Sequence, residues 1–132
     1  MSQIIISEND FDIFLDSTWK KLGSITISNL VKQKLKGIKF INGKMGASIS
    51  LAAIAPTDSA ESYFSEELKT RDELKSEIRF SDKLIDSKNI YQLFEFSCPT
   101  KKILMILETP KSTYETNKSL YEEIIKSFLI KC

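Results

Sequence analysis

The sequence contains no histidine at any of its 132 positions, so it cannot form a Ser-His-Asp triad, a Cys-His dyad or an imidazole metal site. Cys98 is a candidate nucleophile, but it stands just before Pro99 in a predicted turn. A reactive thiolate needs a neighbouring base or a helix N-terminus, and the sequence places neither beside Cys98. We therefore interpret Cys98 as a small turn residue and expect a chain that is not an enzyme.

Adjacent carboxylates could act as an acid and a base or hold a metal ion. Three such pairs occur, each on the polar face of a predicted helix, where solvated surface is their ordinary role: Glu66-Glu67, Asp72-Glu73 and Glu122-Glu123. Residues 42–46 (Asn-Gly-Lys-Met-Gly) are rich in glycine, as a phosphate-binding loop is. In such a loop, however, Ser or Thr and then a helix follow the lysine, whereas a strand follows here. We predict a hairpin turn, no cofactor and no metal site.

Charge is distributed unevenly along the chain, although the formal net charge is only +1. Residues 1–16 hold four acids and no base, whereas residues 17–57 hold seven lysines and no acid. A lysine-only stretch attracts an acidic protein face, a phosphate backbone or an acidic lipid surface. It can equally keep an exposed strand from pairing with its neighbours. Nucleic acid is disfavoured because only Trp19 and Phe40 are interleaved aromatics and no RNA-binding signature occurs.

The candidate partner-binding residues are one tryptophan and six lysines of this stretch. They are Trp19, Lys20, Lys21, Lys32, Lys36, Lys39 and Lys44. Trp19 is by its type more often a core residue than a contact residue, but an exposed tryptophan would make a natural anchor for a partner. The stretch thus predicts docking of a protein that has an acidic face, with strand-edge protection as the open alternative.

Features of the N-terminus and of the cysteines favour a cytoplasmic protein. No basic segment precedes the apolar run Ile4-Ile5-Ile6, which ends too soon for a signal peptide. The longest later run, residues 103–107, is far shorter than the ~20 residues that cross a bilayer. Cys98 and Cys132 fit this location as free thiols, because a bridge to the last residue would tether only a fraying end.

Hydrophobic periodicity predicts six strands and three helices. The strands are residues 11–15, 38–41, 47–54, 78–85, 90–97 and 102–109; the helices are residues 24–36, 58–75 and 118–131. Gly37 serves as the stop signal of the first helix, and Asp58 with Glu61 forms a capping box for the second. Residues 103–107 are apolar on both faces, as in a central strand covered on each side. The predicted fold class is α+β: one domain of residues 1–132, with an antiparallel sheet and helices packed on both of its faces.

Five segments carry a resemblance to a known family. They are residues 11–20 with the tryptophan turn, the small-residue strand 47–54, the Ser-Ala-Glu-Ser-Tyr segment 59–63, the strand 91–96 and the closing segment 121–128. With the order of elements, these segments resemble the family that includes PsbP-type photosystem subunits, DcrB-like bacterial proteins and Ran-binding Mog proteins. Where the family has a proline before the tryptophan turn, this chain has Asp16 or Ser17. None of the shared segments is a catalytic motif.

The resemblance implies a non-catalytic accessory or adaptor protein that binds another protein. A small cytosolic chaperone, or an immunity protein of a secretion or toxin system, is the alternative. An enzyme that uses carboxylates alone is a third. A homodimer is also left open, and a contiguous apolar surface patch would mark the interface.

Overall fold

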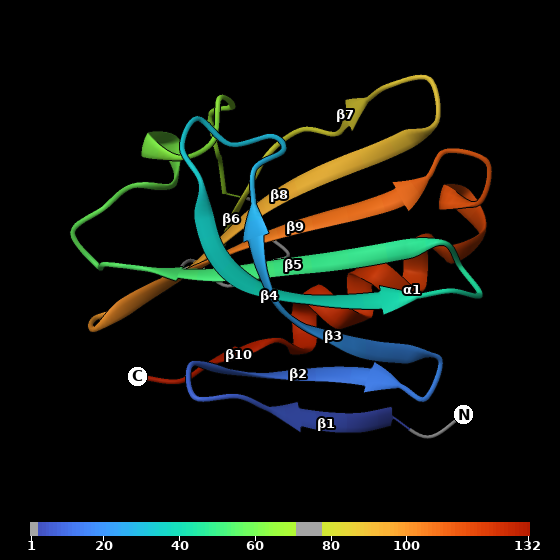
Figure 1. Cartoon of the computed structure of the whole chain (residues 1–132), viewed down its shortest axis with the longest axis horizontal. Helices are drawn as coiled ribbons and strands as arrows, with labels where there is room; N and C mark the ends of the chain where they lie inside the picture. Colours follow the sequence, from blue (N-terminus) through green and yellow to red (C-terminus); the bar gives the residue numbers. More distant parts are fainter. Residues whose placement is uncertain (1–2, 71–77) are drawn as a thin grey trace.

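The structure is a computed structural model that describes residues 3–70 and 78–132 (Figure 1). Most of the described chain is antiparallel strand, in two sheets. The smaller sheet has the order β1-β2-β10 and the larger the order β3-β4-β5-β9-β8-β6, with β7 paired to β8. The strands are β1 (Gln3–Ser7), β2 (Phe11–Asp16), β3 (Trp19–Ile27), β4 (Leu35–Asn42), β5 (Ala47–Ile54), β6 (Ile78–Phe80), β7 (Leu84–Ile85), β8 (Asn89–Cys98), β9 (Lys101–Pro110) and β10 (Leu129–Ile130). The described residues also contain the α-helix α1 (Tyr114–Ser127) and the 3-10 helix η1 (Ala60–Ser62).

The strand predicted over residues 11–15 is confirmed as β2, and its alternation positions the smaller sheet. Phe11, Ile13 and Leu15 are buried, whereas the residues between them are half-buried. The buried side chains join a core that one face of the larger sheet and α1 also line. Phe128, just after α1, stacks on Phe11 with ring centroids 5.2 Å apart and lies 4.3 Å from the ring of Phe96. This aromatic contact joins the two sheets through the end of the helix.

The hairpin predicted over residues 38–54 is confirmed as β4 and β5, although its turn differs in detail. Asn42 stays in β4, paired with Ala47, and the residue with positive φ is Gly46 at +69°. The buried Asn42 side chain accepts a hydrogen bond from the Met45 N–H at 2.9 Å and donates one to the Thr18 hydroxyl at 2.7 Å. The asparagine therefore holds the turn by its side chain rather than by its backbone conformation.

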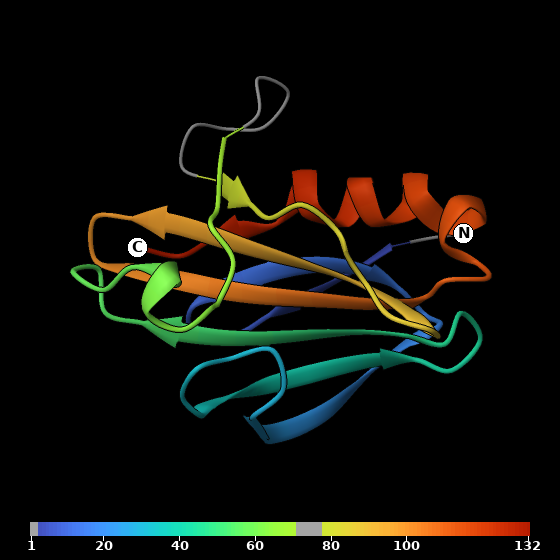
Figure 2. The ribbon, with the colours of Figure 1, turned by 90° about the horizontal axis from the view of Figure 1, so that it is seen from above.

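β9 is the central strand, as its apolar sequence predicts. It pairs with β5 on one side and β8 on the other, and residues 103–107 are all buried. One face of β9 meets α1 and the smaller sheet, and the other meets a second core around Phe64 and Leu68. In Figure 2, α1 and η1 lie on opposite sides of β8 and β9.

The predicted α/β/α sandwich is wrong, because helices do not cover both faces of the sheet. α1 covers one face, and irregular chain at residues 28–34 and 55–70 covers part of the other. Backbone contacts join these segments to each other: the Lys32 N–H donates to the Tyr63 carbonyl at 2.6 Å, and Val31 bridges to Phe64. Side chains add two hydrogen bonds, from Lys32 to the Glu61 carbonyl and from Gln33 to the Ser62 carbonyl. The fold is a β-rich one with a helix on one side.

The helix predicted over residues 24–36 is wrong: these residues form the end of β3, a loop, and the start of β4. The spacing of Leu30, Val31 and Leu35 suits a helix, but β3 and β4 pair from Trp19–Asn42 to Ile27–Leu35, and this ladder outweighs local preference. Gly37 is not a helix stop but a strand residue against a neighbouring backbone. A Cβ at Gly37 would lie 2.1 Å from the Leu51 carbonyl oxygen.

The helix predicted over residues 58–75 is reduced to η1 among the described residues, and residues 71–75 lie outside them. Ser59, not Asp58, caps η1 by accepting the Glu61 N–H. Lys69 instead exchanges backbone hydrogen bonds of 2.9 Å with Phe80. A continuous helix over residues 58–75 would lose these backbone hydrogen bonds between Lys69 and Phe80.

The strand predicted over residues 78–85 is divided into β6 and β7 by Ser81, which is fully buried. The Ser81 hydroxyl accepts the Leu93 N–H at 3.1 Å, and the Ser81 N–H donates to the Leu93 carbonyl at 2.9 Å. The helix predicted over residues 118–131 is confirmed over residues 118–127, but it begins earlier, at Tyr114, and ends at Ser127.

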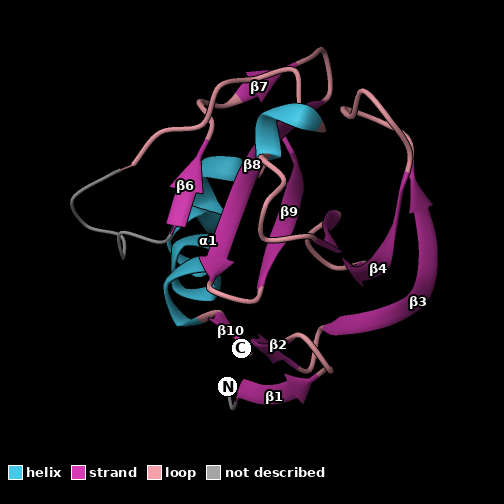
Figure 3. Cartoon of the chain, turned by 90° about the vertical axis from the view of Figure 1, so that its left-hand side faces the viewer, coloured by secondary structure: helices cyan, strands magenta, loops and turns pink. Residues whose placement is uncertain are grey.

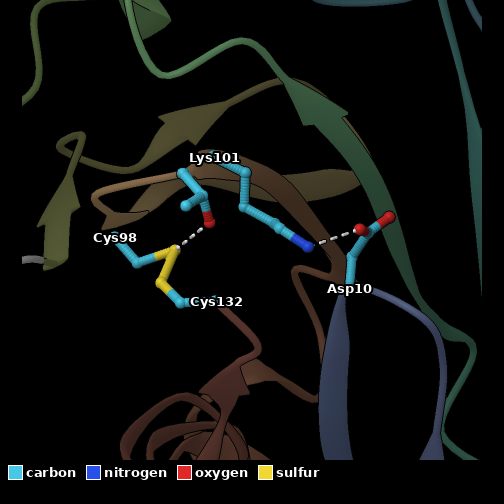
Figure 4. Close-up of a disulfide and its surroundings, with 5 residues drawn as sticks. Asp10, Cys98, Lys101 and Cys132 are labelled. Carbon is cyan, nitrogen blue, oxygen red and sulfur yellow. Dashed lines mark hydrogen bonds and ion pairs between the residues drawn. A yellow bond between two sulfur atoms is a disulfide. The ribbon is translucent and has the colours of Figure 1, made fainter.

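The prediction of free thiols is also wrong, because Cys98 and Cys132 form a disulfide (Figure 4). The last residues are not a fraying end. The Lys131 N–H donates to the Asp10 carbonyl at 2.8 Å, and the Lys131 ammonium to the Glu8 carbonyl at 2.8 Å. These bonds place Cys132 beside the β8–β9 turn, so the disulfide joins the larger sheet to the segment that pairs with β2.

Replacing Gly37 by alanine tests the assignment of residues 35–42 as strand. The new Cβ would meet backbone, which yields little, so we expect a loss of about 3 kcal/mol or more of unfolding free energy. Urea denaturation measures it. Gly43→Ala is the matched control, since nothing lies within 4 Å of a Cβ there. An unchanged stability in Gly37→Ala would contradict the strand assignment.

Removing the disulfide, by Cys98→Ser with Cys132→Ser, tests the connection between the sheets. Its two cysteines are 34 residues apart in sequence, and closing a loop of that size stabilises a fold by about 2–4 kcal/mol. Urea denaturation of the oxidised protein, the reduced protein and the double variant measures the effect. The reduced protein and the variant should unfold together, at lower urea than the oxidised protein.

Candidate binding face

The second face of the larger sheet is covered over part of its length, and the rest is what we call the open half. Residues paired across adjacent strands share a face of a sheet. One row of pairs runs Lys39–Ser50–Ile106, and the next runs Ile41–Ser48–Glu108–Tyr91. Within the described residues, the open half consists of the five of these residues that are not buried: Lys39, Ile41, Ser48, Glu108 and Tyr91. Ser50 (9% exposed) and Ile106 (7% exposed) are buried at its border with the second core. Figure 3 shows β4, β8 and β9, three of the strands that carry the open half.

Small side chains on β5 hollow the open half. Ile49 and Leu51 point into the first core, which leaves Ser48 and Ser50 on the open side. Because serine is much shorter than the side chains on β4 and β9, the surface sinks along β5. A cleft of about 210 Å³ results. It is lined by Ile25, Thr26, Ile27, Ser28, Asn29, Leu30, Lys39, Ser50, Ile106 and Glu108.

Leu30 lies at the end of this cleft in an unusual backbone conformation. Its φ is +66°, in the left-handed region that a leucine rarely adopts. Leu30 also borders a second hollow, of about 250 Å³, that Leu84, Ile85, Asp86 and Tyr91 line. Strained backbone is enriched at binding sites, and here it sets an apolar side chain between two hollows.

The cleft combines charged, polar and apolar groups. Lys39 supplies a cation on one wall, Glu108 an anion on the other, and Ser50 a hydroxyl between them. Ile25 supplies apolar surface, and Ile106, only 7% exposed, lines the cleft from the edge of the second core. Such a mixture can bind polar and apolar groups side by side, with an anionic group opposite Lys39.

A network of three charged side chains holds the cover over the other half of this face. Glu95 on β8 is 2% exposed and accepts the Arg79 Nε–H at 2.7 Å and the Ala60 N–H at 3.0 Å. Arg79 on β6 also donates two hydrogen bonds of 2.9 Å to Glu61 in η1. Glu61 in turn accepts the Leu68 N–H at 3.0 Å. The network fastens residues 60–68 to the sheet.

Arg79 and Glu61 shift each other's pKa. The hydrogen bonds from Arg79 lower the pKa of Glu61 from 4.5 to about 2, against the opposing effect of burial. The same contacts, first with Glu95 and then with Glu61, raise the pKa of Arg79 above its usual value. Glu61 and Arg79 are therefore both charged at neutral pH. A bidentate guanidinium–carboxylate pair such as Arg79–Glu61 fixes orientation as well as distance.

The structure distributes the seven sequence-predicted site residues over both faces of the larger sheet. Trp19 is 7% exposed and belongs to the first core. Lys20 pairs with Ile41 and so borders the open half, Lys39 lies within it, and Lys44 is exposed in the turn at the same end.

The other three lysines lie elsewhere. Lys21 forms an ion pair of 2.9 Å with Glu8. Lys32 donates to the Glu61 carbonyl at 2.8 Å. Lys36 lines a separate hollow of about 240 Å³ beside residues 8–11.

The acid-only N-terminus meets lysines from three distant segments. Glu8 pairs with Lys21, Asp10 with Lys101 at 2.9 Å, and Asp12 with Lys131 at 3.2 Å. The segregation of charge along the sequence is thus partly cancelled in space. In the described chain, no ion pair involves Lys20, Lys39 or Lys44.

The remaining chemical candidates lie apart. Glu66 and Glu67 are exposed beside the second core, Glu122 and Glu123 lie on α1, and Asp72-Glu73 is outside the described residues. Within residues 3–70 and 78–132, no three Cys, Asp or Glu side chains are grouped to hold a metal ion. No helix in this part of the chain is both long and apolar enough to cross a membrane.

Comparison with known proteins gives a fold but no activity. No family model matches the sequence, and no curated protein matches it. A similar solved structure is the solution structure of cyanobacterial PsbP (CyanoP) from Synechocystis sp. PCC 6803, with a TM-score of 0.65. The likeness covers 98% of this chain and 93% of that chain at 14% sequence identity. The chain therefore has a PsbP-like fold, and that part of the predicted resemblance is confirmed.

Sequence reasoning missed Ser50, Ile106, Glu108 and Leu30 as residues of the candidate site. A signal was present, since the alternation of residues 47–54 puts serines on one side of the strand. This alternation indicates a depression in the surface along the strand, once the apolar side of the strand is known to face the core. Leu30 carries no signal, because nothing in the sequence indicates a leucine with positive φ.

Glu61→Gln tests the network through pH. The folded-state pKa of Glu61 lies below the ordinary 4.5, so its stabilisation is complete above pH 4.5 and is lost as the pH falls through about 2. The variant should lose about 1–2 kcal/mol at pH 7, allowing for solvent screening, and should depend less on pH between 4.5 and 2. Urea denaturation across this range measures both. Glu66→Gln, at an exposed carboxylate, should behave as wild type; equal acid sensitivity in all three proteins would contradict the assignment.

Proposed function

We propose that the chain is a non-catalytic accessory protein that binds another protein through the open half. The observation that supports this most directly is the hollowed sheet face bordered by Lys20, Lys39 and Lys44, which have no ion-pair partners in the described chain. An acidic face on the partner would neutralise these lysines. The short side chains of Ser48 and Ser50 on β5 would leave room for an extended segment of the partner between these lysines. Trp19 takes no part as an anchor, because it is buried.

Two alternatives have less support. A carboxylate-only enzyme needs two carboxyl groups in one cleft. Among the described residues the cleft holds Glu108 alone, and the buried Glu95 is bound by Arg79. A chaperone or immunity protein is a narrower form of the binding function. Likeness to the DcrB and Mog proteins stays a prediction.

The disulfide bears on where the protein works. Disulfides persist in oxidising compartments and are rare as structural bonds in the cytosol. The predicted cytoplasmic location therefore stays a prediction, and the Cys98–Cys132 bond is an argument against it. We propose that the folded, bridged protein acts in an oxidising compartment.

Charge reversal on the open half tests the binding function. We expect Lys20→Glu with Lys39→Glu to reduce capture of the partner from native lysate at least tenfold, because both changes oppose an acidic face. Lys118→Glu with Lys126→Glu, an equal change of charge on exposed positions of α1, should leave capture unchanged. Quantitative affinity capture at low salt, with and without nuclease, measures this.

Two results would contradict the proposal. One is equal capture by both double variants, which would move the interface away from the open half. The other is capture that nuclease abolishes, which would replace the protein partner by nucleic acid. Release of the captured protein by salt at about 0.5 M is expected, since exposed charges are then screened.

A further inference from the structure

The described strands leave several sheet edges, and most of them are protected against pairing with another chain. β3 carries Lys20 and Lys21, and its register shifts between Lys21 and Gly23. β6 has three residues and β10 has two. Charged side chains, bulges and shortness are the usual means by which proteins protect an edge.

β1 is the exception. It is the outer strand of the smaller sheet, and its sequence Gln-Ile-Ile-Ile-Ser contains no charge and no proline. It pairs with β2 along its whole length, so its backbone is held extended. Figures 1 and 3 show no other described element beyond its free edge. An uncharged edge of high strand propensity is a template for another strand.

Apolar side chains accompany this free edge on the outer face of the smaller sheet. Ile5 is 58% exposed and pairs with Phe14, which is half-buried. Leu129, on β10 at the other side of β2, is 43% exposed. A strand added beside β1 would extend this apolar surface and shield Ile5 from water.

Charge does not oppose the approach of an identical copy. Residues 1–16 carry four acids, but Glu8, Asp10 and Asp12 each have a lysine partner within the chain. β1 itself is neutral, so two copies side by side place no like charges opposite one another. Its sequence is also near-symmetric about Ile5.

We propose that β1 pairs with β1 of a second copy in antiparallel register centred on Ile5. This register sets Ile5 opposite Ile5 of the second copy, and Gln3 opposite its Ser7. It is a two-fold, self-complementary contact that joins two three-stranded sheets into one of six strands. The contact is small, so the dimer is a weak one that forms with rising concentration.

Charge complementation at Ile5 tests this register, because a two-fold axis passes between the two Ile5 residues. Ile5→Lys sets lysine opposite lysine and should raise the dimer dissociation constant at least tenfold. Ile5→Glu should do the same. A mixture of the two variants should form a heterodimer at concentrations at which each variant alone stays monomeric. Sedimentation velocity over about 5–500 µM, a range chosen for a weak contact, measures all three.

Ile5→Cys supplies an independent measurement with little effect on folding. At a self-opposed position it should give a reducible covalent dimer on mild oxidation, whereas Leu120→Cys, at a 43% exposed position on α1, should not. Two results overturn the proposal. The first is a wild-type protein that stays monomeric over the whole range, which would leave the edge to a foreign strand. The second is a wild-type dimer that Ile5→Lys does not weaken.

Discussion

The burial of β9 on both faces is the constraint on which the rest of the structure depends. A strand that is apolar on both sides needs cover on both sides, and each cover must also satisfy its own backbone. On one side α1 and the smaller sheet supply the cover, and the rings of Phe11, Phe96 and Phe128 join them. On the other side the described chain offers no long helix. Residues 28–34 and 55–70 cover that side as irregular segments, and they reach only part of it.

Irregular cover needs directional bonds, because within the described residues its helical hydrogen bonds are confined to the short turn around η1. Arg79, Glu95 and Glu61 supply them, and they bind the backbone at Ala60 and Leu68 as well as one another. A buried charge is costly unless paired, so Glu95 depends on Arg79 as much as the cover depends on both. The result is a cover that is fixed in place but short. Its shortness leaves the open half of the sheet, so the candidate binding face is a consequence of how this cover is built.

Sequence reasoning predicted the strands that have a clear period and failed where long-range pairing decides. β2, the β4–β5 hairpin and β9 follow from alternation or from an apolar run, because burial acts on the same residues that carry the pattern. The helix expected at residues 24–36 failed because its spacing is equally compatible with β3, a loop and β4, and the pairing partner is distant in sequence. The helix expected at residues 58–75 failed because Glu61 and Lys69 find partners on Arg79 and Phe80 that no local pattern reveals. The disulfide was missed because the burial of Phe128 and the contacts of Lys131, which bring Cys132 to Cys98, are tertiary.

The lysine-only stretch illustrates how one sequence feature can serve two physical purposes. Lys20 and Lys21 stand on the edge strand β3, where charge is a usual protection against pairing with another strand, and Lys20 also borders the open half. Protection and binding were alternatives at the level of sequence, yet they are compatible in space because a strand edge and a sheet face meet at β3. The contrast with β1 makes the distinction useful. Where the chain carries lysines on an edge, a partner must approach over the face of the sheet; where it carries none, a partner can approach along the edge. The two proposed contacts lie on different sheets, so a copy paired at β1 leaves the open half available to an acidic partner.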